Sequence, residues 1–316
     1  MSEQTIAVVL PNYNHAAHLP AAIESVLAQT RPPDEFLIYD DASTDDSVDV
    51  IRSYARKHPV IQLLEGASNV GVHAAHRRLF EVVESDYVDP LAADDTRYPR
   101  CYELAMAMAR EYPAAGILFG KMVIASQAGD VLATLGASVW NEPTYADPGR
   151  FIREYLEHEP PSQSLMAATI FRREPFQEVG WYCGQLGPWG DTFAANAIAL
   201  KYGACYVPEP FACWRKAPGS FSQKTSADPR ATLDVINRAA FMMQTPRYRQ
   251  YFPAKFVTRW QRAYRWRTIK EYWRCDNSDE IPKGASIWTR YRRRLPRSAE
   301  ALSLFWHRTD VTSLEQ

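Results

Sequence analysis

Apolar runs and polar turns alternate along the first 112 residues in a rhythm that predicts strands and helices. Four short apolar runs, at 6–10, 35–39, 60–64 and 87–91, each end in polar residues. Between the runs, apolar residues recur every three or four positions, as on the buried face of a helix. This alternation predicts a mostly parallel α/β sheet flanked by helices, with its polar turns meeting at one edge.

The pattern becomes less regular after Tyr112. Strands are predicted at 116–124 (one long or two short), 165–171, 205–207 and 211–214. The Pro and Gly content of 141–149 and 180–190 predicts loops. Helical spacing begins at Asp191 and again at about Ala231. The later part of the chain therefore adds strands to the sheet and ends in a helical extension.

Two adjacent carboxylates, Asp94 and Asp95, follow the apolar run that ends at Leu91. Thr96 and Pro99 predict that a helix begins directly after them. Like charges side by side repel, and a divalent ion bound by carboxylate and phosphate oxygens relieves that repulsion. Asp-Asp is also common in solvated turns. The pair by itself is therefore compatible with an ion site and with a plain turn.

Composition sets limits on the class of protein. The chain has 316 residues, 46% of them apolar, which is enough for one large domain with an appendage or for two domains. No run is long enough to span a membrane. The run at 6–10 follows without a basic region or signal-peptide core, so a cytoplasmic location is expected. The five cysteines are widely spaced, which argues against a zinc site or disulfide framework.

Charge is distributed unevenly although the formal net charge is only −1. Residues 247–297 hold 15 of the 36 Lys and Arg but 4 of the 37 Asp and Glu. Aromatic residues recur there every four positions, at Phe252, Phe256, Trp260 and Tyr264. Such a segment suits the surface of an anionic membrane. It equally suits a helical appendage that packs its aromatic rings on the preceding domain. No nucleic-acid-binding signature accompanies the charge, so nucleic acid is not expected as a partner.

Several separate motifs follow one another in order over about residues 5–225. They are Val9-Leu10-Pro11-Asn12-Tyr13-Asn14, Tyr39-Asp40-Asp41-Ala42-Ser43-Thr44-Asp45, Asn69-Val70-Gly71 with Arg77-Arg78, Ala93-Asp94-Asp95, Phe171-Arg172-Arg173 with Val179-Gly180, and Gly190-Asp191. Together these motifs resemble the family 2 glycosyltransferases, which have the Rossmann-like GT-A fold. The resemblance implies a nucleotide-diphosphate sugar donor, a UDP-sugar in our interpretation, and inversion at the anomeric carbon.

The resemblance also implies roles at the donor. Pro11, Asn12 and Tyr13 would line the nucleotide pocket, with the Tyr13 ring stacked on the base. Asp41 would accept a hydrogen bond from the base, and Arg78 would lie near the diphosphate or the base. Two plainer roles remain open, because Asp41 can cap a helix and Tyr13 can be a half-buried core tyrosine.

Further roles concern the ion and the acceptor. Asp94 would meet the ribose or sugar, and Asp95 would ligate Mn²⁺ or Mg²⁺. Asp191 would be the general base, since a sugar hydroxyl needs a carboxylate to take its proton; a simple helix cap is the alternative. Trp189 is a candidate acceptor contact. Arg215 and Lys216 are candidate contacts of the diphosphate.

Two departures from the family pattern bear on the ion. Many relatives have Asp where this chain has Ala92, and many have a metal-ligating His where the sequence here reads Trp214-Arg215-Lys216-Ala217. These departures predict weaker or less strict dependence on a metal. They also support a rival interpretation, in which the protein binds sugar nucleotides, or helps membrane-associated assembly, without catalysis.

The sequence as a whole predicts a metal-assisted transferase. Residues 1–226 would form the GT-A domain, and 227–316 would form a basic, aromatic helical extension. The enzyme would transfer a sugar to a saccharide or lipid-linked saccharide in the synthesis of cell-surface polysaccharide or other glycans. It would be cytoplasmic, or peripheral at the inner face of the membrane through residues 247–297.

Overall fold

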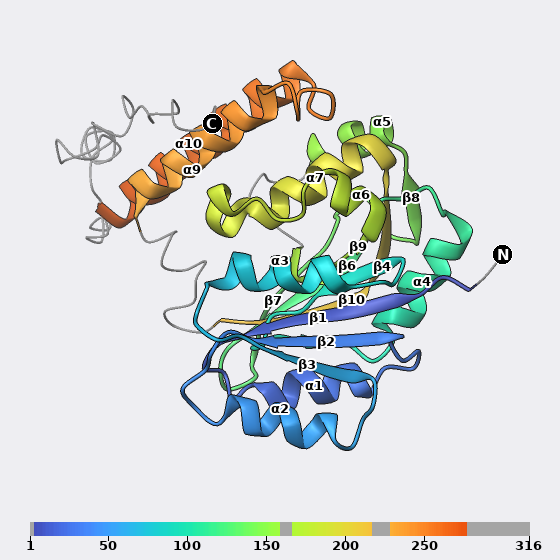
Figure 1. Ribbon diagram of the computed structural model, residues 1–316. Helices are drawn as coiled ribbons and strands as arrows, with labels where there is room; N and C mark the ends of the chain where they lie inside the picture. Colours follow the sequence, from blue (N-terminus) through green and yellow to red (C-terminus); the bar gives the residue numbers. More distant parts are fainter. Residues whose placement is uncertain (1–2, 159–165, 217–227, 277–316) are drawn as a thin grey trace, which may run out of the picture. The chain divides into compact units, whose positions relative to one another are not determined.

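The structure, a computed structural model, describes residues 3–158, 166–216 and 228–276 (Figure 1). The chain forms two compact units. The first runs through Gln185 and resumes at Gly190, and the second joins Leu186–Trp189 to the chain after Ala217. The predicted boundary between residues 226 and 227 lies outside the described residues and stays a prediction.

Within the described residues, ten strands form one sheet. The strands are β1 (Ile6–Asn12), β2 (Glu35–Asp40), β3 (Ile61–Glu65), β4 (Tyr87–Pro90), β5 (Thr96–Arg97), β6 (Ile117–Ala125), β7 (Val131–Leu135), β8 (Thr144–Ala146), β9 (Thr169–Arg172) and β10 (Ala204–Arg215). Their order is β3-β2-β1-β4-β9-β6-β10-β5, with β7 paired to β6 and β8 to β10. The four strands β3, β2, β1 and β4 run parallel. The predicted mixed, mostly parallel α/β class is confirmed for this half of the sheet, and β9 is the antiparallel strand that joins it to β6.

Helices cover both faces of the sheet, as expected when parallel strands are joined by crossovers. The first unit contains α1 (Leu19–Leu27), α2 (Ser47–Ala55), α3 (Val72–Val82), α4 (Cys101–Glu111), α5 (Pro148–Arg150), α6 (Arg173–Glu178) and α7 (Gly190–Tyr202). Figure 1 shows α1 and α2 on one side of β1–β3 and α3 on the other. The stretch Ile6–Leu10 is fully buried between these layers, which explains why it is apolar at every position.

Two predicted elements differ from the structure. Residues Thr96 and Arg97 do not begin a helix. They form β5, which pairs antiparallel with Ala212 and Cys213 of β10, and helix α4 begins only at Cys101. The two strands predicted near 205–214 are one strand, β10, because a bulge between Tyr206 and Pro210 absorbs the prolines while the pairing to β6 continues.

The described part of the second unit is a helical hairpin of α9 (Pro229–Gln244) and α10 (Ala254–Asp276), which lie side by side (Figure 1). Three of the four repeated aromatic residues are buried, because Phe252 just before α10 and Trp260 and Tyr264 within it are at most 7% exposed, whereas Phe256 is half-buried. Trp189 belongs to this unit and packs its ring on Trp260 and Tyr264, with centroids 5.7 and 4.5 Å away. The aromatic repeat is therefore a packing surface inside the unit.

None of the described helices combines the length and apolar character needed to cross a bilayer. The part of the basic segment 247–297 that follows residue 276 lies outside the described residues.

Candidate functional site

The polar turns predicted to converge do meet at the carboxyl edge of the parallel strands. Asn12 ends β1 and pairs in register with Asp40 at the end of β2. The Asp41 amide donates to the Asn12 carbonyl oxygen at 2.8 Å. The turn after β4 begins when the Leu91 amide donates to the Val9 carbonyl oxygen at 2.9 Å. The turns after these neighbouring strands therefore lie along one edge of the sheet, the edge at which α/β sheets bind ligands.

Asn12 and Asp40 form the floor of this edge. Asn12 is 2% exposed, and its amide nitrogen donates to Asp40 at 2.8 Å and to the Ser43 hydroxyl oxygen at 3.1 Å. Ser43 in turn donates to Asp40 through its hydroxyl, at 2.6 Å, and through its backbone amide, at 2.9 Å. The network ties the end of β1 to the turn after β2. Asn12 therefore has a structural task besides the nucleotide contact predicted for it.

Asp41 is 2% exposed and holds the loop between β3 and α3. Its two oxygens accept hydrogen bonds from the Val70 and Gly71 amides, each at 2.8 Å. Gly71 has a φ of +84°, a conformation that glycine adopts at little cost. Asp41 thus links its own motif to the Asn69-Val70-Gly71 motif, and we call these linked residues the wall. Asp41 holds this loop and does not cap α2.

The rings and the cation predicted for the base lie near this wall. Tyr13 is 43% exposed, so it is not a core tyrosine and its ring is accessible to a base. Pro11 is half-buried beside it in β1. The Arg78 guanidinium lies over the Tyr39 ring, 5.6 Å from the ring centroid. This places the Arg78 charge above the end of β2.

The Asp94-Asp95 turn is fastened to β10. Asp95 is 3% exposed, and one of its oxygens accepts from the Arg215 amide at 3.1 Å, whereas Asp94 is half-buried. Burial, reinforced by the negative charge of Asp94, raises the pKa of Asp95 to about 8. The Lys216 amide donates to the Ala125 carbonyl oxygen at 2.9 Å. Two predicted contacts, Arg215 and the Asp pair, therefore lie together.

The carboxyls of Asp94 and Asp95 fit a divalent ion only if a ligand such as a diphosphate supplies further oxygens to the same ion. Among the described residues, no three His, Cys, Asp or Glu side chains are grouped to hold a metal. Burial is the main cause of the raised pKa of Asp95, and Arg97 and Arg215 oppose it only in part, so a cation would further favour the charged carboxylate. Mg²⁺ and Mn²⁺ accept such sets, one or two carboxylates completed by phosphate oxygens and water. The residues present fit an ion that arrives with a diphosphate.

A buried ion pair that the sequence interpretation missed supports the turn from below. Arg97 and Asp89 are 1% and 0% exposed, and two guanidinium nitrogens donate to Asp89 at 2.7 and 2.6 Å. The Tyr102 hydroxyl donates to the same carboxylate at 2.8 Å. The pair links the two ends of the segment that carries Asp94 and Asp95. A charge inside the apolar run at 87–91, with an Arg eight residues later, was the signal available in the sequence.

Asp191 lies in the first turn of α7, directly after Gly190. The Thr192 amide and hydroxyl both donate to the same oxygen of Asp191, which leaves the other oxygen outside this pair of bonds. Burial raises the pKa of Asp191 to about 6, and the Thr192 bonds oppose that rise. Burial, reinforced by the negative charges of Asp191 and Asp89, raises the pKa of the Tyr182 hydroxyl. A carboxyl with the pKa of Asp191 is ionised at neutral pH and can accept a proton.

The aromatic residues before Asp191 pack against other rings. Trp181 is 9% exposed and lies against Phe80 and Phe176. Tyr182 joins the same cluster. Trp189 packs within the second unit, so the structure gives it a packing role and leaves its predicted acceptor contact a prediction.

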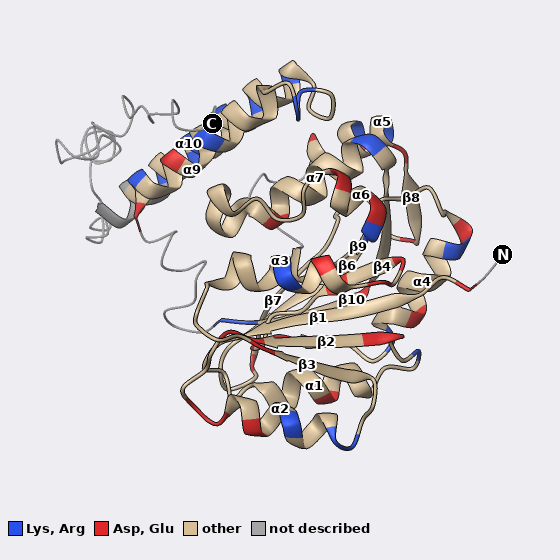
Figure 2. Ribbon diagram, viewed as in Figure 1, with Lys and Arg blue, Asp and Glu red and all other residues tan. Residues whose placement is uncertain are grey.

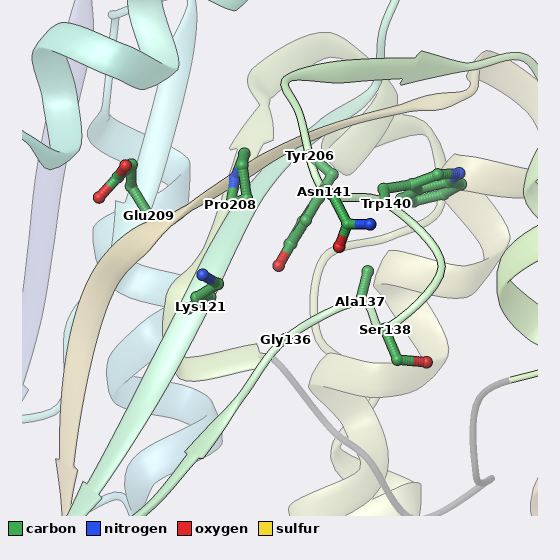
Figure 3. Close-up of a pocket in the computed structure, with 9 residues that line it drawn as sticks. All are labelled: Lys121, Gly136, Ala137, Ser138, Trp140, Asn141, Tyr206, Pro208 and Glu209. Carbon is green, nitrogen blue, oxygen red and sulfur yellow. The ribbon is translucent and has the colours of Figure 1, made fainter.

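A separate cavity of about 390 Å³ opens beside the bulge of β10 (Figure 3). It is lined by Lys121, Gly136, Ala137, Ser138, Trp140, Asn141, Tyr206, Pro208 and Glu209. Gly136 allows the backbone to lie against Tyr206, because a Cβ atom there would come within 2.6 Å of the Tyr206 hydroxyl. None of the predicted site residues lines this cavity.

Comparison with known proteins assigns the family. The model of glycosyl transferase family 2 matches residues 7–180. The chain belongs to glycosyl transferase family 2. The match contains the predicted donor motifs from Pro11 to Asp95 and ends before Asp191.

Similar proteins agree with this assignment. A relative, the uncharacterized glycosyltransferase YibD of Escherichia coli K12, is 38% identical over 35% of this chain and 32% of its own length. The chain thus spans about a third of that relative. Among solved structures, S. aureus TarS in complex with UDP-GlcNAc matches 95% of this family 2 chain and 81% of its own, with a TM-score of 0.64 and 12% identity. The Pyrobaculum calidifontis mannosyltransferase PcManGT, in complex with GDP-Man and Mn²⁺, matches 96% and 83%, with a TM-score of 0.58 and 18% identity. These likenesses confirm the predicted glycosyltransferase fold.

Proposed function

We propose that this family 2 chain is an inverting glycosyltransferase that moves a sugar from a UDP-sugar to a saccharide or lipid-linked saccharide. The observation that carries the proposal is that these residues lie along one edge of one sheet. The turn of Asp94 and Asp95 is bonded to Arg215 there, and Tyr13 and Asp41 follow β1 and β2 of the same sheet. The pathway we propose is the synthesis of cell-surface polysaccharide or other glycans. A lipid-linked acceptor would suit a peripheral position at the membrane, which the charge of residues 247–297 supports.

Donor binding follows from the side chains at this edge. The exposed Tyr13 ring would stack on the uracil, and Asp41 would hold the 69–71 loop against the base. Arg78 would add positive charge near the diphosphate. Asp94 would meet the ribose or sugar, and Asp95 would hold a divalent ion together with the diphosphate. When bound, that ion neutralises charge on the departing UDP, a task that Arg215 and Lys216 would share.

Proton transfer is assigned to Asp191. Its pKa, raised to about 6, increases the affinity of the carboxylate for a proton and still leaves it ionised at pH 7. It would take the proton of the acceptor hydroxyl as that oxygen attacks the anomeric carbon from the face opposite UDP, which inverts the configuration. The location of Asp191 in the first turn of α7, directly after Gly190, supports this role.

The experiment is a thermal-shift series with UDP, GDP, CDP and ADP, each with and without Mn²⁺. A ligand that binds only the native state at 100 times its Kd stabilises by about 2.7 kcal/mol. We expect the largest shift with UDP plus Mn²⁺. Asp95→Asn and Asp94→Asn, compared with each other, identify the carboxylate on which the Mn²⁺ response depends. No shift with any nucleotide would reject the proposal.

The rival is a protein that binds sugar nucleotides without catalysis. Ala92, and the sequence Trp214-Arg215-Lys216-Ala217 where many relatives have a metal-ligating His, favour it. The two functions separate in one assay, because both predict UDP binding but only the transferase releases UDP from a UDP-sugar.

A further inference from the structure

One face of α10 is basic and exposed along its whole described length. Five exposed side chains form this face: Lys255, Arg259, Arg262, Trp266 and Lys270. Trp266 is 51% exposed. At 100° per residue these five positions fall within an arc of about 80°. The opposite face, with Trp260 and Tyr264, is buried. Figure 2 shows the blue bands of Lys and Arg that repeat along this hairpin. We call the five residues the α10 stripe.

The composition of the stripe identifies its partner by charge and by shape. No Asp or Glu occurs between Ala254 and Lys270, so this stretch of the helix carries cations without an acidic residue among them. The row is straight and about 22 Å long, given a rise of 1.5 Å per residue. A helix with Lys and Arg around an exposed Trp suits the plane of an anionic bilayer, where cations meet headgroups and the indole ring lies at the interface. A large apolar ring exposed among cations is otherwise unfavourable.

We propose that the α10 stripe docks this protein on an anionic membrane surface, with Trp266 inserted at the headgroup level. The inference deepens the proposed function and rests on it for its purpose, since a lipid-linked acceptor would lie in the same bilayer. The proposed docking differs from the sequence-based expectation in the face of α10 that would contact the membrane. Trp260 and Tyr264 of the aromatic repeat are buried, and the proposed contact is made by the four cations and by the exposed Trp266.

The test is sedimentation of the full chain with vesicles of phosphatidylcholine, alone or mixed with phosphatidylglycerol. The wild type is expected to bind the mixed vesicles and to leave them at high salt, because surface charge is screened. The triple variant Lys255→Gln, Arg262→Gln, Lys270→Gln removes three cations of the stripe. Its partition coefficient is expected to fall on the order of 100-fold.

A matched control removes the same charge from the other unit. Arg56→Gln, Lys57→Gln and Arg110→Gln neutralise three exposed cations and should bind vesicles nearly as the wild type does. Equal losses in the two triple variants would overturn the proposal, since net charge alone would then explain the binding. Equal binding to neutral and mixed vesicles would overturn it as well.

Trp266→Ala tests insertion. Brominated acyl chains quench indole fluorescence at the interface, so the wild type should lose more emission on binding than the variant does. Equal quenching would overturn the insertion of Trp266. Binding of soluble polyphosphate without binding of vesicles would show that the α10 stripe binds a different ligand, and it would overturn the proposed membrane docking. Calorimetry with UDP on the same variants separates the two proposals, because a protein that binds UDP but not vesicles fails only this inference.

Discussion

At the residue scale, the surroundings of Asp191 determine how the proposed base titrates. Burial raises its pKa to about 6. A base must be deprotonated, and an acid with a raised pKa loses its proton only as the pH rises through that value. We expect kcat to increase with pH and to reach a plateau above an apparent pKa near 6. Saturating donor and acceptor make the profile report the bound enzyme.

Thr192→Val provides the control for this pH profile. The Thr192 hydroxyl donates to Asp191 at 3.1 Å and so favours the charged form. Its removal should move the acidic limb of the profile to higher pH. A wild-type profile that stays flat through pH 6 would argue against Asp191 as the base.

The buried pair of Arg97 and Asp89 predicts a large cost when one partner is removed alone. Arg97→Met leaves an uncompensated carboxylate in the core and should lower the free energy of unfolding by ~3–5 kcal/mol. Arg77→Met is the matched control, because it breaks the exposed pair with Glu81, where the expected loss is about 0.5 kcal/mol. Urea denaturation measures both.

The double variant Asp89→Leu, Arg97→Met removes both buried charges and should recover part of the lost stability. A loss for Arg97→Met no larger than that for Arg77→Met would contradict the structural account of this pair.

The residues of the candidate site were predictable from the sequence where they lie in turns that directly follow apolar runs. Asp41, Asp94 and Asp95 end apolar runs, so their convergence follows from the parallel sheet. Asp89 and Arg97 were not predicted, because a buried charge is stable only with its partner and no local pattern shows that the two side chains meet. The packing of Trp189 was missed for the same reason, since its partners follow some 70 residues later.

At the scale of elements, the strand–helix alternation predicted the parallel half of the sheet well. The departures arise where distant segments pair. Thr96 and Arg97 carry helix-start signals, but pairing with Ala212 and Cys213 makes them a strand. In β10 the prolines at 208 and 210 predicted a break, whereas the bulge opposite Gly120 accommodates them. Tertiary pairing overrode local preference in both places.

The loop held by Asp41 gives a prediction at this scale. Asp41→Asn replaces one carboxylate oxygen with an NH₂ group, which cannot accept from the amide of Val70 or Gly71. The wall of the nucleotide pocket should loosen, and UDP affinity should fall by ~1.5–3 kcal/mol, the worth of a charge-assisted hydrogen bond. Titration calorimetry measures the affinity. Asp45→Asn is the control, because Asp45 also accepts from backbone amides, but those of Ala16 and Ser47. Unchanged UDP affinity in Asp41→Asn would remove Asp41 from the site.

At the scale of the whole molecule, charge asymmetry and family motifs predicted a transferase domain with a basic helical extension. The fold of the first unit is confirmed by the solved structures it resembles. The extension shows why composition alone was ambiguous. Its periodic aromatics could face a membrane or a core, and the burial of Trp260 and Tyr264 beside Trp189 assigns these two rings to a core.

The central claim is that this chain transfers sugar with Asp191 as the base. The most direct measurement is UDP release from a UDP-sugar in the presence of acceptor, together with UDP affinity, for the wild type and Asp191→Asn. The substitution keeps size and polarity but cannot take a proton. We predict unchanged UDP affinity and turnover lower by ~10²–10⁴-fold, the range for loss of a general base. Near-normal turnover in Asp191→Asn, or a wild type that binds UDP-sugars but never releases UDP, would contradict the account.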